Sequence, residues 1–272
     1  MSLRARISIL LLMGVAGTPL AAQRYWHTPP VSRWTVGLEG YRPIFQEEGA
    51  KFFTGALFLS AGTRVGERMV LEAELPIGLS SLDDPIGSTT LAGNPYVGLR
   101  FPNARGSFVG HAGIRLPLAQ EPDNLGALAA YAAGGIADLD RLEAFIPERM
   151  TFRGGGEFIT RNRNGFLFGF RAGGAFLVDA GGNGVDPEFI ADYGVRAGHE
   201  SADYLATIGV TGRAVLTESD LGFDDRSFHS IVSQIELRPG MIRPSLTVRV
   251  PLDSSIRDIS SVIVGLGFSI SW

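Results

Sequence analysis

The 272-residue chain contains no cysteine. This absence excludes a disulfide framework, a thiolate metal site and a cysteine nucleophile. Charged residues make up only 19% of the chain, and the formal net charge is -4. A general nucleic-acid-binding protein normally carries a basic face, so this balance argues against nucleic acid as a partner. The four histidines, His27, His111, His199 and His229, are too dispersed to predict a metal site.

Long apolar segments are also scarce, and the first of them lies at the N-terminus. Arg4 and Arg6 precede the apolar residues 7–15, and small residues follow up to Ala22. A basic region, a short apolar core and small residues near a break are typical of a secretory signal peptide. A buried or anchoring helix is the alternative, but nine apolar residues are too few to span a membrane. We predict that residues 1–22 are removed from an exported protein.

No later segment is long enough for a membrane helix. Beyond residue 25 the longest apolar run is Leu125–Ala137, thirteen residues that include two adjacent glycines, whereas a spanning helix needs about 20. Yet the chain is 45% hydrophobic and contains 36 glycines, which is too apolar for an ordinary soluble surface and too rich in glycine for helices. If residues 23–272 lie in a membrane, they must form a closed β-barrel, the other architecture that satisfies every backbone group in lipid.

Apolar and polar residues alternate in twelve segments between Trp34 and Trp272. Residues 69–77 and 242–250 are two of them, with apolar side chains at every second position. Side chains on a strand point alternately to opposite faces, so each segment has one apolar and one polar face. A soluble β-sandwich alternates in the same way and stays open as an alternative.

The connectors between these segments alternate in length, which favours a barrel. Five are short, such as residues 238–240, and six are longer, up to residues 119–148. Bacterial outer-membrane barrels have an even number of antiparallel strands, short periplasmic turns and longer outer loops. We therefore predict an all-β fold, a transmembrane antiparallel up-and-down β-barrel of about 12 strands that forms a single domain over residues 23–272. Ten or fourteen strands stay open as alternatives.

Aromatic residues of the apolar face lie at the strand ends beside the short turns. These positions suit an aromatic girdle at a membrane interface, and the residues are Trp34, Phe101, Phe108, Phe158, Phe166 and Trp272. The last segment, Val262–Trp272, alternates and ends in an aromatic residue, and it resembles the terminal signal strand of Gram-negative outer-membrane proteins. The resemblance implies an outer-membrane location, contact with its lipids and lipopolysaccharide, and recognition of this strand by the barrel-assembly machinery.

A second resemblance covers nine residues. Residues 92–100, with the sequence AGNPYVGLR, are similar to a Gly-Asp-Pro…Gly-Leu segment of channel-like barrels attributed to the MetA pathway of phenol degradation. Asn94 stands where that segment has aspartate. The resemblance implies a channel-like barrel.

The polar faces of the segments line the lumen in this arrangement, where eight arginines face six carboxylates. Twelve strands lie between the eight-stranded barrels that side chains fill and the larger ones that hold a water channel. The lumen is therefore either a narrow polar pore, in which arginines opposite two glutamates orient small solutes, or a closed set of ion pairs. The candidate selectivity residues are Glu72, Glu74, Arg100, His111, Arg115, Arg153, Glu157, Arg171, Arg196, Arg213, Arg243 and Arg249, and Glu39, Asp192 and Glu236 share their face.

The longest connector, residues 119–149, is rich in alanine and leucine. The apolar spacing in residues 125–133 and 138–145 predicts one or two short helices. Folded into the mouth of the barrel, such a segment would constrict the channel or line a site for an apolar solute. The alternative is a segment that only caps the rim.

An enzymatic alternative rests on Ser227 and His229, which share the apolar face near the outer rim. Some outer-membrane barrels are lipid hydrolases with a Ser/His pair on the outer wall. A nucleophilic serine needs a histidine within hydrogen-bond reach and a third group that orients the histidine, which Asp224 or Asp225 would supply if the loop folds back. The order Ser-x-His differs from the His-x-Ser of phospholipase barrels.

Taken together, these patterns favour a porin-like outer-membrane channel for the passive passage of small solutes, with no enzymatic activity, cofactor or metal. A sealed structural or adhesive barrel is the first alternative. A lipid hydrolase that uses Ser227 and His229 is the second.

Overall fold

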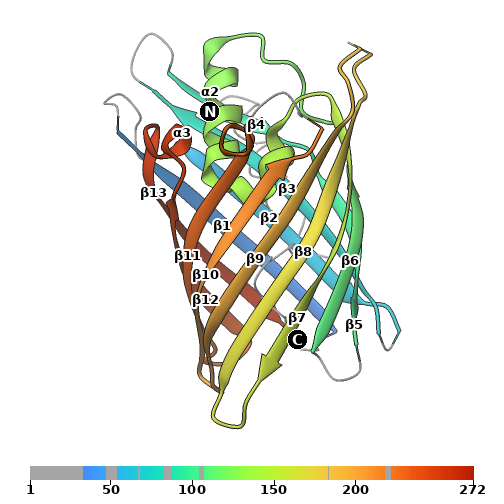
Figure 1. Ribbon diagram of the computed structural model, residues 1–272, viewed down its shortest axis with the longest axis vertical. Coiled ribbons are helices and arrows are strands. Elements are labelled where there is room, and N and C mark those ends of the chain that lie inside the picture. The colour runs from blue at the N-terminus through green and yellow to red at the C-terminus, as the bar shows by residue number, and fades with distance from the viewer. Residues whose placement is uncertain are drawn as a thin grey trace, which may run out of the picture.

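The computed structural model of the protein describes residues 33–46, 54–66, 68–82, 87–103, 107–182, 184–217 and 222–272. The predicted signal peptide lies outside these residues and stays a prediction. The described residues form one antiparallel sheet that closes on itself (Figure 1). Its strands are β1 (Trp34–Phe45), β2 (Gly55–Arg64), β3 (Val70–Ser81), β4 (Ser88–Ala92), β5 (Tyr96–Pro102), β6 (Phe108–Arg115), β7 (Arg149–Arg161), β8 (Phe166–Asp179), β9 (Glu188–Glu200), β10 (Tyr204–Val215), β11 (Ser227–Leu237), β12 (Ile242–Pro251) and β13 (Ser260–Ser271).

The barrel closes between its first and last strands. β1 pairs with β2 on one side and with β13 on the other, and β2 pairs onward with β3. Both β4 and β5 pair with β3, so they are two parts of one strand interrupted at residues 93–95. The barrel therefore has 12 antiparallel strands, which confirms the predicted fold class.

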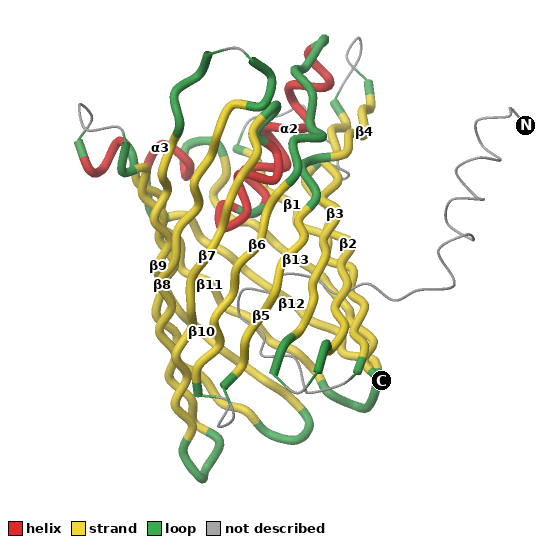
Figure 2. The backbone as a smooth tube through the Cα atoms, turned by 90° about the vertical axis from the view of Figure 1, so that its right-hand side faces the viewer, coloured by secondary structure: helices red, strands yellow, loops and turns green. Residues whose placement is uncertain are grey.

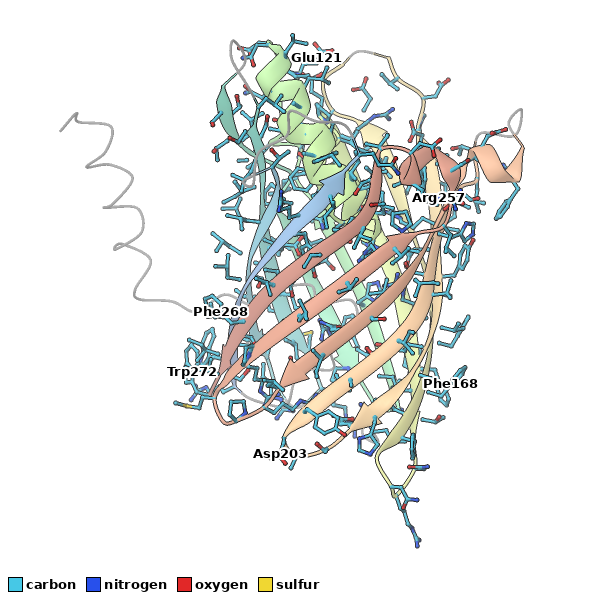
Figure 3. All side chains as sticks on the ribbon, turned by 90° about the vertical axis from the view of Figure 1, so that its left-hand side faces the viewer. Glu121, Phe168, Asp203, Arg257, Phe268 and Trp272 are labelled. Atoms are coloured by element: carbon cyan, nitrogen blue, oxygen red, sulfur yellow. The ribbon has the colours of Figure 1, made fainter. Side chains whose placement is uncertain are left out.

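The outer wall is apolar, and the inner wall is polar. Among the outward side chains, Leu266 is 67% exposed and Phe168 is 54% exposed, and Figure 3 shows Phe168 and Phe268 pointing away from the barrel. A soluble β-sandwich would bury these residues between two sheets, and the single closed sheet excludes that alternative. Of the six predicted girdle residues, Phe101, Phe108, Phe158, Phe166 and Trp272 are strongly exposed. Five of the six lie on strands near the short turns, and Trp272 directly follows β13.

The two ends of the barrel differ. One end, here called the turn end, carries the short connectors and Trp272; the other, the loop end, carries the long connectors with α2 (Leu125–Ala137) and α3 (Ser254–Arg257). Figure 2 shows α2 and the helical segments that follow it at the loop end, among the strands. No helix among the described residues is long and apolar enough to cross a membrane.

Candidate functional site

The connector between β6 and β7, residues 116–148, folds into the lumen and is called the insert below. It contains α2 and the 3₁₀ segment η1 (Leu139–Phe145). Asp138, Asp140, Arg141 and Glu143 are at most 2% exposed, although charged side chains of a surface connector would be solvated. The insert is therefore a part of the barrel interior, and of the two arrangements predicted for it, the structure shows the one inside the mouth.

Local capping sets the course of the insert. The side chain of Asn124 accepts a hydrogen bond from the Ala127 N–H (2.9 Å) and begins α2, and the side chain of Asp138 accepts one from the Asp140 N–H (3.1 Å) and begins η1. The backbone N–H of Glu148 donates to the Ala119 carbonyl (2.9 Å). The insert thus leaves and rejoins the barrel at adjacent points of the loop end.

Arg141 is the cation that the insert brings to the wall. Its guanidinium contacts Glu74 (2.7 Å), Glu39 (2.9 Å) and Asp138 (2.7 Å) and lies 3.6 Å from the centre of the Phe58 ring. Burial favours the neutral form, but the three carboxylates outweigh it and hold the pKa of Arg141 well above its usual range.

Glu143 is the carboxylate at the centre of the ion-pair contact between the insert and the wall. It lies against Arg153, 2.7 Å from Arg213 and 3.5 Å from Arg115, and its side chain is fully buried. The three arginines come from β7, β10 and β6, which lie on different parts of the wall. One side chain of the insert therefore joins strands that do not all pair with one another.

The two aspartates complete the contact. Asp138 lies 3.0 Å from Arg249, and Asp140 lies 2.8 Å from Arg171 and 3.2 Å from Arg249. Burial alone would raise the pKa of Asp140, but Arg171, Arg249 and Arg213 outweigh it and hold this pKa at about 2. Asp140 is consequently ionised at neutral pH.

The charges of the insert balance those of the wall. The eight arginines predicted for the lumen exceed the six carboxylates of that face by two, and the three buried carboxylates of the insert, Asp138, Asp140 and Glu143, exceed Arg141 by two in the opposite sense. Arginines buried in the barrel without these carboxylates would remain unpaired, which is costly. The insert therefore supplies the carboxylates that pair with the excess arginines of the wall.

The turn end is organised differently, because its ion pairs form within the wall. Glu72 lies 2.6 Å from Arg100, and Glu157 lies 2.6 Å from Arg196. Glu236 lies 2.9 Å from Arg238 and 4.0 Å from Arg243. These carboxylates need no residue of the insert.

All twelve candidate selectivity residues thus lie on the lumen face, in two groups. Glu74, Arg115, Arg153, Arg171, Arg213 and Arg249 contact the insert or its partners, and Glu72, Arg100, Glu157, Arg196 and Arg243 form pairs toward the turn end. His111 pairs in register with Arg100 on β5 and therefore shares its face. A role in selectivity stays a proposal for all of them.

Sequence analysis missed the residue that holds the insert by its backbone. The Asn94 side chain donates to the carbonyls of Ile146 (2.6 Å) and Glu143 (3.2 Å) and accepts from the Ala119 N–H (2.8 Å), and its own N–H donates to the Ala144 carbonyl (2.7 Å). An aspartate side chain would have no N–H to donate to the carbonyls of Ile146 and Glu143. The signal in the sequence is that asparagine stands at this position, where the similar Gly-Asp-Pro segment has aspartate.

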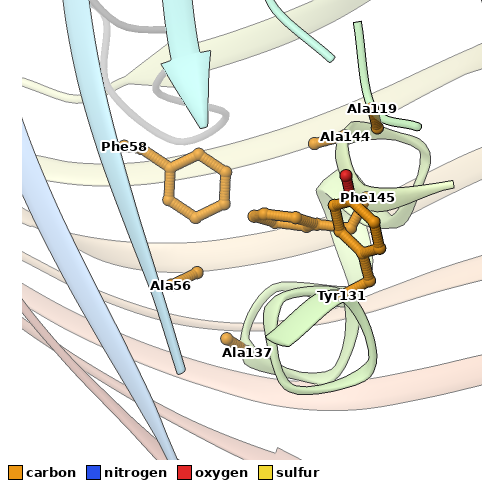
Figure 4. Close-up of a cluster of buried hydrophobic side chains, with 7 residues drawn as sticks. All are labelled: Ala56, Phe58, Ala119, Tyr131, Ala137, Ala144 and Phe145. Carbon is orange, nitrogen blue, oxygen red and sulfur yellow. The ribbon is translucent and has the colours of Figure 1, made fainter. Parts of the chain in front are cut away.

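The apolar part of the lumen was missed as well. Phe58 of β2 is fully buried and packs edge-on against Phe145 of the insert, with ring centres 5.8 Å apart. Figure 4 shows this cluster, which contains Ala56, Phe58, Ala119, Tyr131, Ala137, Ala144 and Phe145. The wall strand also approaches closely here, since a Cβ at Gly78 would lie 2.7 Å from the Ala130 carbonyl oxygen. The residues predicted to line the lumen, all of them polar, thus omit this apolar cluster.

The structure does not join Ser227 to His229. The Ser227 hydroxyl is buried and has no hydrogen-bond partner among the described residues. His229 instead contacts the Tyr193 hydroxyl through Nε2 (2.6 Å) and Asp253 through Nδ1 (3.0 Å). Asp253 contacts His229 in place of the predicted Asp225, and the side chain of Asp224 lies outside the described part of the structure. Among the described residues there is also no group of three histidine or acidic side chains that could hold a metal ion.

Comparisons with known proteins address the fold. No protein-family model and no curated protein match the chain. The solved COG4313 outer membrane channel from Pseudomonas putida F1 is 11% identical with a TM-score of 0.59, over 93% of this chain and 100% of that chain. The protein has the fold of the outer-membrane β-barrels. This match agrees with the resemblance of residues 92–100 to channel-like barrels.

Two further barrels match less well. LpxR from Salmonella typhimurium is 10% identical with a TM-score of 0.47, over 88% of this chain and 100% of that chain. The toluene transporter TodX of Pseudomonas putida is 10% identical with a TM-score of 0.41, over 90% of each chain. The fold and its apolar outer wall support an outer-membrane location for this barrel.

Proposed function

We propose that this barrel is an outer-membrane channel for small solutes, closed by the insert and opened when the insert moves out of the lumen. The observation that carries the proposal is the charge of the buried contact. Well-packed apolar side chains would seal a lumen at least as stably as buried ion pairs. A wall that presents Arg153, Arg171, Arg213 and Arg249 to the insert would become a hydrophilic path once the insert moves.

The attachment of the insert supports movement as a unit. Its two ends meet at the Ala119–Glu148 hydrogen bond, and the β6–β7 pairing beneath them runs from Phe108 to Arg115 without residues of the insert. Release of the insert would therefore leave the strand pairing of the wall intact. By the usual arrangement of such barrels, the loop end faces outward and the turns face the periplasm.

Ion selectivity of the open state follows from the wall that remains. Without the insert, the sequence-predicted lumen set keeps an excess of two arginines, so the open channel is expected to prefer anions. At the turn end the pairs Glu72–Arg100 and Glu157–Arg196 would line the path and orient dipolar solutes. The outward apolar wall would contact membrane lipid and lipopolysaccharide, and Val262–Trp272 would be read by the assembly machinery.

The test is the conductance of the refolded protein in planar bilayers, with and without the insert. Residues 120–147 are replaced by two glycines, a short link that suits ends joined by one hydrogen bond. We expect rare, brief steps for the full chain and continuous, anion-selective conductance for the deletion. Shortening the connector at residues 180–187 is the matched control and should leave the full chain closed.

A deletion variant that folds, as judged by circular dichroism and heat-modifiable migration, yet stays electrically silent would refute the channel. It would favour the sealed structural or adhesive barrel. A lipid hydrolase is not proposed, because the Ser227 hydroxyl lacks a hydrogen bond to His229.

A further inference from the structure

An apolar cavity of about 360 Å³ lies between the insert and the wall at the loop end. The insert forms one side of it, and β11 and α3 supply the other. No charged side chain lines it, in contrast to the charged contact formed by the neighbouring residues of η1. The main lining side chains are Tyr131, Leu139, Leu142, Phe145, Phe228 and Ile256.

The spacing of the lining residues explains why the cavity is apolar. Leu139, Leu142 and Phe145 recur every three residues, which is the number of residues in one turn of a 3₁₀ helix, and the backbone is kinked between the first two at Arg141. The charged residues between them, including Arg141 and Glu143, point to the wall arginines and carboxylates. The same short segment therefore presents one side to the cavity and the other to the ion pairs that hold the insert.

The lining determines which molecules fit. A charged ligand would lose its hydration here without gaining an ion pair, which is unfavourable. The hydroxyl of Tyr131 already accepts the Gln120 N–H (3.2 Å), and burial raises the pKa of this hydroxyl, so it stays neutral. An apolar cavity of about 150 Å³ is large enough for benzene, so about 360 Å³ suits a larger neutral molecule, such as a bicyclic hydrocarbon skeleton.

The wall side of the cavity is held in place by polar contacts. Asp253 is the N-cap residue of α3, but its side chain makes no capping bond and contacts both the backbone N–H and Nδ1 of His229. His229 in turn contacts Tyr193 on β9 (2.6 Å). Ile256 follows Asp253 by three residues, and Phe228 precedes His229, so these contacts position both lining residues of the wall.

We infer that this cavity binds a neutral apolar molecule of two or three rings and that such molecules are a solute class of the channel. The inference rests on the proposed channel function. Because a ligand in the cavity contacts Leu139 and Leu142, it touches the segment whose other side closes the lumen.

Two probes with one skeleton test the ligand class. N-phenyl-1-naphthylamine is neutral and fluoresces in apolar surroundings, and 8-anilinonaphthalene-1-sulfonate adds a fixed negative charge. Both are titrated into the protein in lipid nanodiscs, with empty nanodiscs as background. We expect saturable binding of the neutral probe and at least about tenfold weaker binding of the sulfonate.

Cavity-filling variants locate the binding. Ala132 lines the cavity from an exposed position of α2, so Ala132→Trp should fill it without disturbing the buried contact and weaken binding about tenfold or more. Ile256→Trp fills it from α3 and should do the same. Leu125→Trp is the matched control, because Leu125 is 66% exposed on the same helix and outside the cavity; its affinity should stay within about twofold of wild type.

Equal binding of the neutral probe by wild type and both cavity variants would overturn the inference, as would equal binding of the two probes. The two proposals fail separately. Conductance of the insert deletion without saturable binding by the full chain would contradict the cavity site alone. Saturable binding with a silent deletion variant would contradict the channel alone.

Discussion

At the turn end of the lumen, Glu72 and Arg100 pair between neighbouring strands, whereas at the loop end Arg213 and Arg249 reach carboxylates of the insert. The turn-end pair joins β3 and β5, which are hydrogen-bonded to each other. The loop-end pairs depend on the insert, which enters the lumen from the loop end of the barrel. The comparison teaches that one end of the lumen is balanced by the wall itself and the other by residues of the insert.

The first prediction removes the cation of the insert. Arg141→Met leaves Glu39, Glu74 and Asp138 without their shared partner, and breaking a buried ion pair costs about 3–5 kcal/mol. We expect the insert to leave the lumen, which would appear as rapid proteolysis of the insert from outside and as frequent channel openings. The matched control is Arg149→Met, whose partner Glu188 keeps 32% of its side chain exposed and is therefore solvated when Arg149 is lost. Equal proteolysis of the two variants would contradict the role of Arg141 in holding the insert.

The second prediction concerns the backbone contacts of the insert. Asn94→Asp removes the donors to the carbonyls of Glu143 and Ile146, and each buried acceptor left unsatisfied costs about 1–3 kcal/mol. Proteolysis of the insert should accelerate while the circular dichroism of the barrel stays unchanged. Asn103→Asp is a control at a turn-end connector, where Asn103 contacts Ser107, and it should leave the insert protected.

The lumen arginines and Asn94 show how much of the site can be predicted from the sequence. A period of two placed the lumen side chains correctly, because a strand fixes the face of every residue along it. It gave no partner for Arg213 or Arg249, since the carboxylates of Glu143 and Asp138 come from a connector whose residues do not follow that period. Asn94 contacts residues about 50 positions later, and no local rule identifies such a contact.

The third prediction is a pH dependence confined to the loop end. The pKa of Asp140 is lowered to about 2 in the folded barrel and is about 4 in an unfolded chain. Asp140 therefore stabilises the insert inside the lumen fully above about pH 4, and this contribution is lost as the pH falls through about 2. Openings should be constant from pH 7 to 5 and should increase between about pH 4 and 2. In Asp140→Asn the increase should be smaller; an identical acid response would mean that other carboxylates control release.

The smallest effect is expected at the turn end. Glu72→Gln keeps a hydrogen-bond acceptor for Arg100 but removes a negative charge from the wall. The full chain should stay closed, because no contact of the insert changes. In the insert deletion, reversal potentials should shift toward stronger anion preference by about twofold in permeability ratio, as expected for less than about 1 kcal/mol in a hydrated lumen. Increased opening of the full chain would show that the two ends are coupled.

The most direct measurement of the central claim is the open probability of Glu143→Gln beside wild type and Glu188→Gln. Glu143 contacts three arginines inside the barrel, whereas Glu188 contacts Arg149 at the rim with 32% of its side chain exposed. If charge complementarity holds the insert in place, Glu143→Gln raises the open probability about tenfold or more, and Glu188→Gln matches wild type. An open probability of Glu143→Gln equal to wild type, with the insert deletion conducting, would contradict that claim.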